Sequence, residues 1–357
     1  MCSRPPRKYF PGKIKASRVF AVFFPARRRL CLLMDNVKKI LFISLSNVGD
    51  IVLTTPVFRK LRELFPDAVI DVVSGPSGKS IFGPDPAVRK VTVRRKRQSM
   101  AQRIAEIIGW RREKYDIAVD LKNSLVPLLV GARRAVPLIP FARKSGHMRD
   151  MHLRVIKGLG VRNSSHAGFM IPVSEQDRVL VAGILGEEEN TPAKRIVTIS
   201  PGAKSHMKRW PARKYAEIID LLGGEYGLRV FIVGGEEDAA TAASIISCVR
   251  DKEIVADLTG KTTIGALYEL MRRSDMLLTN DSGPLHVASA AGTPTVAIFG
   301  PSNEKNYGPL SEKSEILFPD MPCRPCGKAL CAKGLKDGCI PMIGVELVFE
   351  SARKVLG

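Results

Sequence analysis

Residues 279–301 read TNDSGPLHVASAAGTPTVAIFGP, and this stretch organises the rest of the chain. It follows the apolar run 276–278, which predicts a buried strand. A short helix of small residues is expected next and can end at Gly292, and residues 295–299 read as a second buried strand. The pattern predicts a strand, a tight turn and a helix, as in a parallel α/β sheet.

The turn inside this stretch has the chemistry of an anion site. Asp281 and Ser282 are favoured N-cap residues, and Pro284 is tolerated in a first helical turn. Free backbone N–H groups and the helix dipole favour negative charge, and Gly283 would let a phosphate approach the backbone. An ordinary strand-to-helix turn could carry the same residues, so this stretch alone leaves both interpretations open.

Composition narrows the class of protein. The chain has 357 residues, enough for two domains, and its 45% apolar and 6% aromatic content favours a soluble mixed α/β enzyme. The formal charge of +21 predicts an acidic partner such as nucleic acid, an anionic membrane surface or a phosphate-bearing substrate. Neither an RNA-recognition pattern nor a zinc-finger spacing is present, so we expect no nucleic acid. No apolar run reaches the ~18 residues of a membrane span.

The N-terminal segment differs from the rest. Residues 1–35 carry nine Lys or Arg and no acid before Asp35, with several aromatic residues among them. Such a segment can lie on an anionic membrane surface, or, since Met34 precedes the first strand, it can be a leader without a fold of its own. It makes a poor signal peptide, so we expect a cytoplasmic protein, with or without peripheral contact at the inner face of the inner membrane.

Two series of alternating strands and helices predict two parallel sheets. The first series begins with the strand run 39–45, and the pattern resets near residue 170. The second series includes the stretch 279–301, and a last helix is expected over 345–356. We therefore expect a basic leader (1–35), a first Rossmann-like domain (36–170) and a second (171–357).

The suggestive side chains follow strands, at the sheet edge where ligands bind in open parallel sheets. Asp50 can be a general base or an acid that complements a helix dipole, and Lys208 can bind an anion or form a surface pair. Glu236 can bind ribose hydroxyls or be an exposed loop acid, and His286 can contact a phosphate or simply pack. The turn 46–50 has one glycine where the dinucleotide fingerprint needs three, which disfavours a nicotinamide or flavin dehydrogenase.

Two further clusters are open to a functional and a plain interpretation. The spacing C-x2-C-x4-C-x7-C can hold a metal ion or a cluster, or it can be a loop of reduced thiols; its members are Cys323, Cys326, Cys331 and Cys339. Four basic residues form either a rim for an acidic acceptor or ordinary surface charge; these are Arg143, Lys144, Arg149 and Arg154.

No Asp-x-Asp occurs in the chain, although a metal-dependent nucleotide-sugar transferase usually needs paired carboxylates for its cation. In a transferase of this kind, the helix dipole and Lys208 would have to neutralise a leaving diphosphate. We therefore expect no metal and no cofactor.

Taken together, these motifs closely resemble the lipopolysaccharide heptosyltransferase family, the family-nine glycosyltransferases. The similarity covers residues 38–356 and is carried by ILFISLSNVGDIVLTTP at 40–56, KRWP at 208–211, GGEED at 234–238 and NDSGPLHVASAAGTPTVAIFGP at 280–301. The resemblance implies a GT-B fold, in which two Rossmann-like domains face each other across a cleft. The cysteine-rich stretch also looks like one found in several members of the family.

The resemblance also implies an activity. It is the transfer of heptose from the co-substrate ADP-heptose to the lipopolysaccharide inner core, with inversion and without a metal. The first domain would bind the acceptor, an anionic lipid-linked core oligosaccharide, and the second the nucleotide sugar. Asp50 matches the catalytic base, Lys208 the contact to the donor phosphates and Glu236 the acid near the nucleoside. The family's donor-binding turn corresponds to Asp281, Ser282, Gly283 and His286.

The chain departs from the family's pattern in two places. Typical members lack the leader at 1–35, and residues 203–206 do not match the small hydroxyl residues expected in some members. Two alternatives therefore stay open: the same fold using another nucleotide sugar for a different surface polysaccharide, and an interaction protein organised by a metal or cluster on the cysteines. We expect a monomer.

Overall fold

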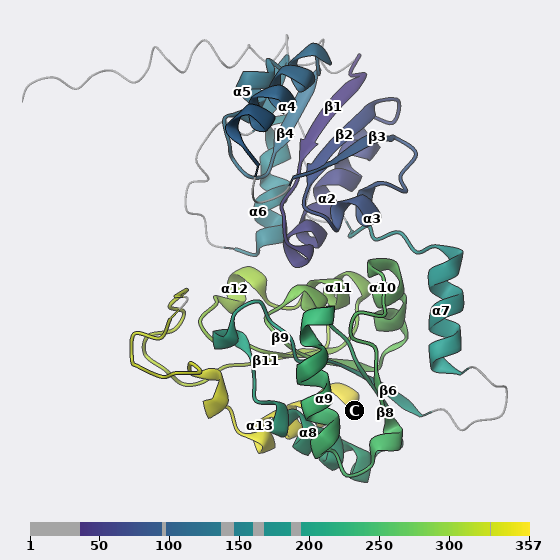
Figure 1. The fold of residues 1–357 in the computed structure, drawn as a ribbon, viewed down its shortest axis with the longest axis vertical. Coiled ribbons are helices and arrows are strands. Elements are labelled where there is room, and N and C mark those ends of the chain that lie inside the picture. The colour runs from purple at the N-terminus through teal and green to yellow at the C-terminus, as the bar shows by residue number, and fades with distance from the viewer. Residues whose placement is uncertain (1–35, 95–97, 137–145, 160–167, 187–193, 329) are drawn as a thin grey trace, which may run out of the picture.

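The computed structural model describes residues 36–94, 98–136, 146–159, 168–186, 194–328 and 330–357. These residues form two α/β domains, one above the other, and each domain has its own sheet (Figure 1). The predicted leader at 1–35 lies outside the described residues. The division near residue 170 falls in the segment that leads from the first sheet to the helix α7 (Glu175–Leu185), and it stays a prediction.

The first sheet has five parallel strands in the order β3-β2-β1-β4-β5. Its strands are β1 (Lys39–Ile43), β2 (Val69–Ser74), β3 (Val88–Val93), β4 (Ile117–Asp120) and β5 (Arg134–Val136). Its helices are α2 (Val48–Leu64), α3 (Gly78–Phe82), α4 (Met100–Arg112), α5 (Val126–Val130), α6 (Met148–Val155) and the 3-10 turn η2 (Ile156–Leu159). The central strands are buried along their length because helices cover both faces of a parallel sheet.

The core of this domain lies between β1 and α2. Three aromatic rings meet there, with centroids 5.7 Å apart for Phe42–Phe58 and Phe42–Phe82 and 5.0 Å apart for Phe58–Phe82. All three side chains are fully buried. This packing fixes the first turn of α2 against the end of β1, and the first turn carries Asp50.

The second sheet has six parallel strands in the order β11-β10-β9-β6-β7-β8. They are β6 (Arg195–Ser200), β7 (Leu228–Ile232), β8 (Val255–Asp257), β9 (Met276–Asn280), β10 (Thr295–Ile298) and β11 (Ser314–Leu317). Its helices are α7, α8 (Ala212–Glu225), α9 (Ala239–Cys248), α10 (Ile264–Arg273), α11 (Gly283–Ala291), α12 (Glu304–Tyr307) and α13 (Val345–Leu356). Short 3-10 turns are η3 (His206–Lys208), η4 (Glu236–Asp238), η5 (Lys252–Ile254) and η6 (Ile340–Met342).

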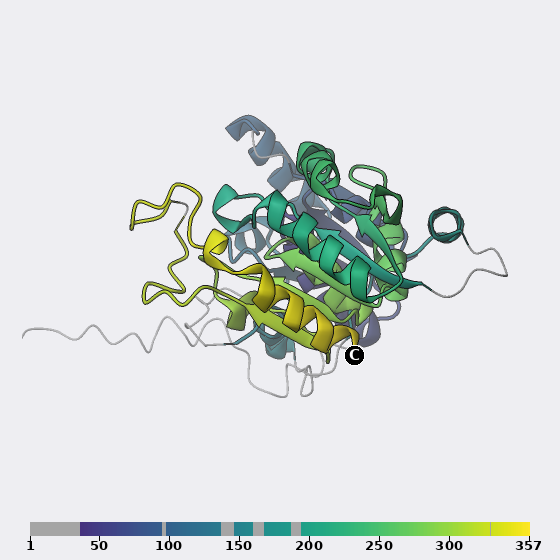
Figure 2. The ribbon, with the colours of Figure 1, turned by 90° about the horizontal axis from the view of Figure 1, so that it is seen from below.

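Figure 2 shows α8 and α13 side by side on one face of the second sheet, and α13 packs against α8 and the strands β9 to β11. The terminal helix predicted over 345–356 is therefore part of the core of the second domain. None of the helices in the described ranges combines the length and the hydropathy that crossing a membrane would require.

Both sheets have a topological switch point at their first strand. Strand order runs from β1 to β2 and β3 on one side and to β4 and β5 on the other, and β6 lies between β7 and β9 in the same way. Ligands bind beyond the carboxyl ends of strands at such a point. The stretches that follow β1, β6 and β9 carry most of the candidate residues.

The two domains share an apolar contact. Helix α11 of the second domain packs against α2 of the first, and one buried cluster contains Ile51 and Val52 from α2 with Val287 and Ala288 from α11. The two switch points are thereby held facing each other.

Candidate functional site

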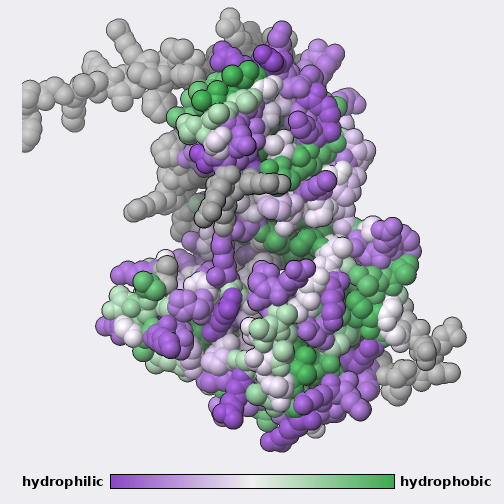
Figure 3. Space-filling view, in the orientation of Figure 1, coloured by the Kyte–Doolittle hydropathy of each residue, from purple (hydrophilic) through white to green (hydrophobic). Residues whose placement is uncertain are grey.

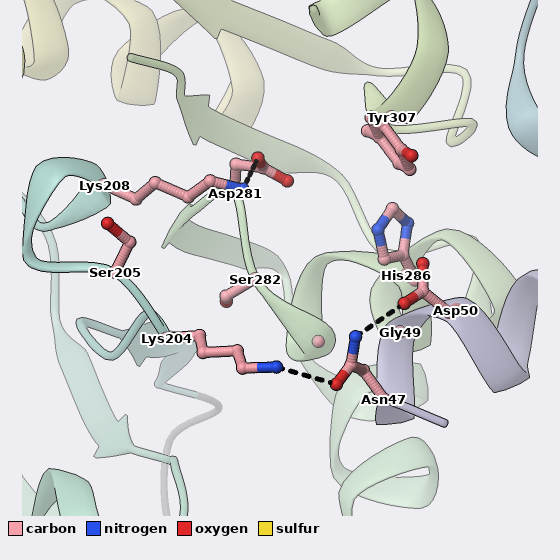
Figure 4. Close-up of a pocket in the computed structure, with 11 residues that line it drawn as sticks. Asn47, Gly49, Asp50, Lys204, Ser205, Lys208, Asp281, Ser282, His286 and Tyr307 are labelled. Atoms are coloured by element: carbon pink, nitrogen blue, oxygen red, sulfur yellow. Dashed lines mark hydrogen bonds and ion pairs between the residues drawn. The ribbon is translucent and has the colours of Figure 1, made fainter. Parts of the chain in front are cut away.

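A cavity of about 410 Å³ lies between the two domains at these facing strand ends (Figure 4). The first turn of α2, the loop after β6, the start of α11 and the end of α12 contribute to its wall. The lining residues are Asn47, Gly49, Asp50, Lys204, Ser205, Lys208, Asp281, Ser282, Gly283, His286 and Tyr307. Six of the seven sequence-predicted catalytic and donor-binding residues are therefore brought together.

Asp50 is connected to the opposite domain through one amide side chain. The Asn47 Nδ2 donates a hydrogen bond to the Asp50 Oδ2 at 2.8 Å. The Lys204 Nζ, from the loop after β6, donates to the Asn47 Oδ1 at 3.1 Å. Because Asn47 both donates and accepts, it fixes the orientation of the Asp50 carboxylate relative to a cation of the second domain (Figure 4).

Lys208 and Asp281 form an ion pair on the other side of the cavity. The Lys208 Nζ lies 2.6 Å from the Asp281 Oδ2, and the Asp281 side chain is only 7% exposed. Of the two N-cap residues that the sequence offered, Ser282 occupies the N-cap position of α11, without a side-chain cap hydrogen bond, and Asp281 precedes it. The carboxylate of Asp281 instead holds the Lys208 ammonium at the start of α11, where an anion would meet both.

The loop that carries Lys208 is fastened to β9 by a buried amide. The Asn280 Nδ2 donates to the Pro201 carbonyl at 2.6 Å, and the Asn280 Oδ1 accepts from the Trp210 N–H at 3.2 Å. The indole of Trp210 is buried and donates from Nε1 to the Ile343 carbonyl at 3.1 Å. Both ends of the loop 201–211 are thereby fixed.

His286 lies in α11 with its ring 5% exposed. Its Nδ1 is buried and has no hydrogen-bond partner among the described residues. Burial lowers the pKa of His286 to about 4, against the opposing pull of the Asp281 and Asp50 carboxylates. The imidazole is therefore neutral at pH 7, so one ring nitrogen can donate and the other can accept.

Gly49 marks a close approach of the two domains in this site. A Cβ on Gly49 would lie 2.5 Å from the His286 Cδ2 and 3.2 Å from the Gly283 Cα. Only a residue without a side chain lets the first turn of α2 approach the first turn of α11 this closely. Asp50 and the helix N-terminus thus share one cavity because of the glycine that precedes Asp50.

Glu236 lies apart from the cavity. It begins the turn η4 after β7, is exposed, and is not among the lining residues. Its neighbour Asp238 is buried against Gly202 and Gly234, where any Cβ would lie within 2.6 Å of the carboxylate. Burial raises the pKa of Asp238. The motif GGEED therefore joins the ends of β6 and β7, and the role of Glu236 stays a prediction.

The remaining candidates lie elsewhere. Arg149, in the first turn of α6, pairs with the adjacent Asp150 at 2.8 Å and does not line the cavity. Arg143 and Lys144 are outside the described residues. The four cysteines of the predicted cluster are free thiols between β11 and α13. Within the described part of the chain, no group of three or more His, Cys, Asp or Glu side chains is arranged to hold a metal ion.

Sequence reasoning did not single out five of the lining residues, one of which is Gly49. Asn47, Lys204 and Ser205 lie in the turns that follow β1 and β6. A polar residue shortly after a strand at the switch point is a local signal that could have found them. Tyr307 had no such signal, since it reaches the cavity only because the four-residue helix α12 folds back over α11.

Two Rossmann-like domains that face each other across a cavity at their switch points have the arrangement of the GT-B fold. The profile described as Glycosyltransferase family 9 (heptosyltransferase) matches residues 176–336. Over this range the chain is similar to this family of glycosyltransferases.

Similarity to individual proteins extends over most of the chain. A lipooligosaccharide heptosyltransferase 2 from Haemophilus influenzae is 26% identical over 318 residues, which cover 78% of this chain and 88% of that protein. A lipopolysaccharide heptosyltransferase 3 from Escherichia coli is 28% identical over 74% of this chain and 84% of its own length.

Solved structures share the fold over most of the chain. The crystal structure of a family 9 glycosyl transferase from Veillonella parvula is 27% identical, has a TM-score of 0.76, and covers 89% of this chain and 97% of its own. The fold is also shared by the Escherichia coli ADP-heptose LPS heptosyltransferase II. It is 24% identical, has a TM-score of 0.69, and covers 89% of this chain and 98% of its own.

Proposed function

We propose that the protein transfers a heptose from ADP-heptose to the inner core of lipopolysaccharide, with inversion at the anomeric carbon and without a metal ion. The observation that carries this proposal is the cavity in which Asp50 of one domain faces Lys208 and the start of α11 of the other. The names of the similar heptosyltransferases support the choice of sugar and acceptor.

The second domain would bind the donor. The backbone N–H groups at the start of α11 and the Lys208 ammonium converge on one region of the cavity, as a diphosphate requires. Gly283 has no side chain to keep a phosphate away from the backbone, and the neutral His286 can donate one hydrogen bond. Glu236, outside the cavity, would contact the nucleoside beyond the diphosphate.

Asp50 would act as the general base. It would accept the proton of the acceptor hydroxyl as that oxygen attacks the anomeric carbon through an oxocarbenium-like transition state, while ADP leaves from the opposite face. The hydrogen bond from Asn47 holds the carboxylate in one orientation and leaves its other oxygen available for the proton.

Positive charge at the leaving group supports a reaction without a metal. Lys208 and Lys204 both face the cavity, and the α11 dipole adds to them. Because the Asp281 carboxylate already holds Lys208, that ammonium is in place before the donor binds and needs no reorganisation when charge develops on ADP. This is the role that the sequence assigned to Lys208.

The first domain would bind the acceptor, with Arg143, Lys144 and Arg149 as candidate contacts to its anionic groups. The protein would act as a monomer at the cytoplasmic face of the inner membrane, where a lipid-linked acceptor is accessible.

The test is an assay with purified protein, ADP-heptose and heptose-deficient core lipid, each with and without a chelator. Transfer that survives chelation is expected. The matched control omits the acceptor, which separates transfer from hydrolysis of the donor. Absence of transfer, or transfer that is lost on chelation, would contradict the proposal.

A second candidate, the same chemistry with another nucleotide sugar, is favoured by one observation. The stretch 203–206 does not match the small hydroxyl residues expected in some members of the family, and Lys204 and Ser205 of this stretch line the cavity. A thermal-shift comparison of ADP with UDP separates the two: greater stabilisation by ADP supports the heptose donor, and greater stabilisation by UDP supports the alternative.

A further inference from the structure

An apolar surface on α4 and α5 has no covering element in the described part of the chain. Its side chains are between 44% and 69% exposed and belong to Met100, Ile104, Ile108, Leu125, Leu128 and Leu129. Figure 3 shows hydrophobic residues gathered over these two helices at the end of the first domain. We call these six residues the α4–α5 face.

The α4–α5 face is not a by-product of core packing. Both helices cover the first sheet with other residues, namely Ile107 and Trp110 of α4 and Val126 and Val130 of α5. On α4, Met100, Ile104 and Ile108 recur every four residues and form one outward stripe. The two helices are joined by a hydrogen bond from Arg111 Nη1 to the Leu129 carbonyl at 3.3 Å, so the six side chains form a continuous surface.

Positive charge surrounds this face. Arg103, Arg111 and Arg112 are exposed on α4, and no carboxylate in the described ranges pairs with any of them. The acids nearest in sequence are already engaged. Glu106 accepts from Gln98 at 2.7 Å and lies 3.5 Å from Arg94, and Glu113 lies 2.8 Å from Arg89. The face therefore combines exposed aliphatic side chains with uncompensated arginines.

We propose that the α4–α5 face docks on an anionic phospholipid bilayer. Aliphatic side chains on an amphipathic helix enter the boundary between headgroups and acyl chains, and flanking arginines remain at the level of the phosphates. A protein partner would need a carboxylate placed opposite each arginine, whereas an anionic bilayer supplies a counter-charge wherever the arginines lie. The net charge of +21 acts in the same direction.

Docking in this way would suit the orientation of the molecule. The α4–α5 face lies on the end of the first domain that points away from the second domain (Figure 1). The second domain would then remain in solution, where it can exchange a soluble nucleotide. The link to a lipid-borne acceptor rests on the proposed function, but binding to a bilayer does not require donor, acceptor or turnover and is measured without them.

The experiment is flotation of the full-length protein with vesicles of phosphatidylcholine containing phosphatidylglycerol, compared with vesicles of phosphatidylcholine alone. We expect binding to the anionic vesicles. The variant Ile104→Gln/Ile108→Gln should weaken it by about tenfold or more, since it removes apolar burial. The variant Arg111→Gln/Arg112→Gln should remove most of the preference for anionic over neutral vesicles.

The matched control is Val179→Gln/Leu347→Gln, which removes two aliphatic side chains that are 64% and 51% exposed on α7 and α13 of the second domain. Circular dichroism melts establish that each variant is folded. The proposal is overturned if the wild type does not float, if the α4 variants float as the control does, or if the wild type sediments as a dimer that Ile104→Gln/Ile108→Gln converts to monomer. Loss of flotation with transfer to detergent-dispersed acceptor retained leaves the proposed function intact.

Discussion

His286 should make the protein less stable in mild acid, and replacing it should remove that effect. Burial lowers its pKa from 6.5 to about 4, so the unfolded chain takes up a proton at this position more readily than the folded protein. Stability is therefore fully present above the unfolded pKa and falls as the pH drops from about 6.5 towards 4, below which both states are protonated. Asp50 and Asp281 oppose the shift, and the positive charge of Lys208 reinforces it.

The magnitude follows from the two pKa values. A difference of 6.5 minus 4 at 1.36 kcal/mol per pKa unit gives roughly 3 kcal/mol over the whole window, and roughly 2 kcal/mol of this is lost between pH 7 and pH 5. The folded pKa values of His147 and His152 are also lowered by burial, so the wild type alone cannot isolate one histidine. The informative quantity is the difference between variants.

The assay is urea unfolding of the wild type, His286→Gln and His206→Gln at pH 7 and at pH 5. His206 is an exposed histidine on the loop after β6 and serves as the matched control. We expect His286→Gln to lose roughly 2 kcal/mol less than the wild type on acidification, and His206→Gln to behave as the wild type. Parallel pH dependence in His286→Gln and the wild type would refute the reasoning.

Three further predictions concern the cavity. Asp50→Asn should lower turnover by about 10²–10⁴-fold and leave donor affinity within a few-fold, because the base acts in the transition state. The control Asp67→Asn, which changes an exposed acid beyond the end of α2, should leave turnover unchanged. Full turnover by Asp50→Asn would remove Asp50 from the mechanism. Lys208→Met should lower kcat/KM about 10²-fold or more and lower the melting temperature, because it leaves the buried Asp281 carboxylate unpaired. Adding Asp281→Asn should restore the melting temperature but not the activity. Recovery of both would make the ion pair purely structural. Gly49→Ala should lower the free energy of unfolding by about 1–3 kcal/mol, because the added Cβ displaces His286. The control Gly183→Ala on α7 adds a Cβ in open space and should not destabilise the protein. Equal melting temperatures of the two variants would contradict the close approach of Gly49 to His286.

Much of the fold could be predicted because its longer elements have clear periodicity. The strand runs 39–45 and 295–299 and the helix over 345–356 are found at or within two residues of the expected bounds, since each has a clear apolar pattern. Edge strands β5, β8 and β11 were not anticipated. They have three or four residues each and only partly buried side chains, so hydrogen bonding to a neighbouring strand defines them more than any apolar run does.

The candidate site was predictable to the extent that strand ends of parallel sheets converge. That rule brought Asp50, Lys208 and His286 to one cavity although they lie far apart in the sequence. Glu236 follows β7, the strand next to β6, and lies outside the cavity, so its predicted role stays a prediction. The rule gave no hint of Asn47 joining Asp50 to Lys204, since a contact between domains depends on how the two sheets are oriented.

The apolar seam between α2 and α11 limits how the enzyme can admit its substrates. Ile51, Val52, Val287 and Ala288 are fully buried in a cluster that runs through both domains. Pulling the domains apart would expose this surface to water at a cost of about 25 cal/mol for each Å², whereas pivoting about the seam would keep it covered. Widening of the cavity is therefore expected to be a hinge rotation with the seam as its axis, and thermal unfolding to be a single cooperative transition of both domains.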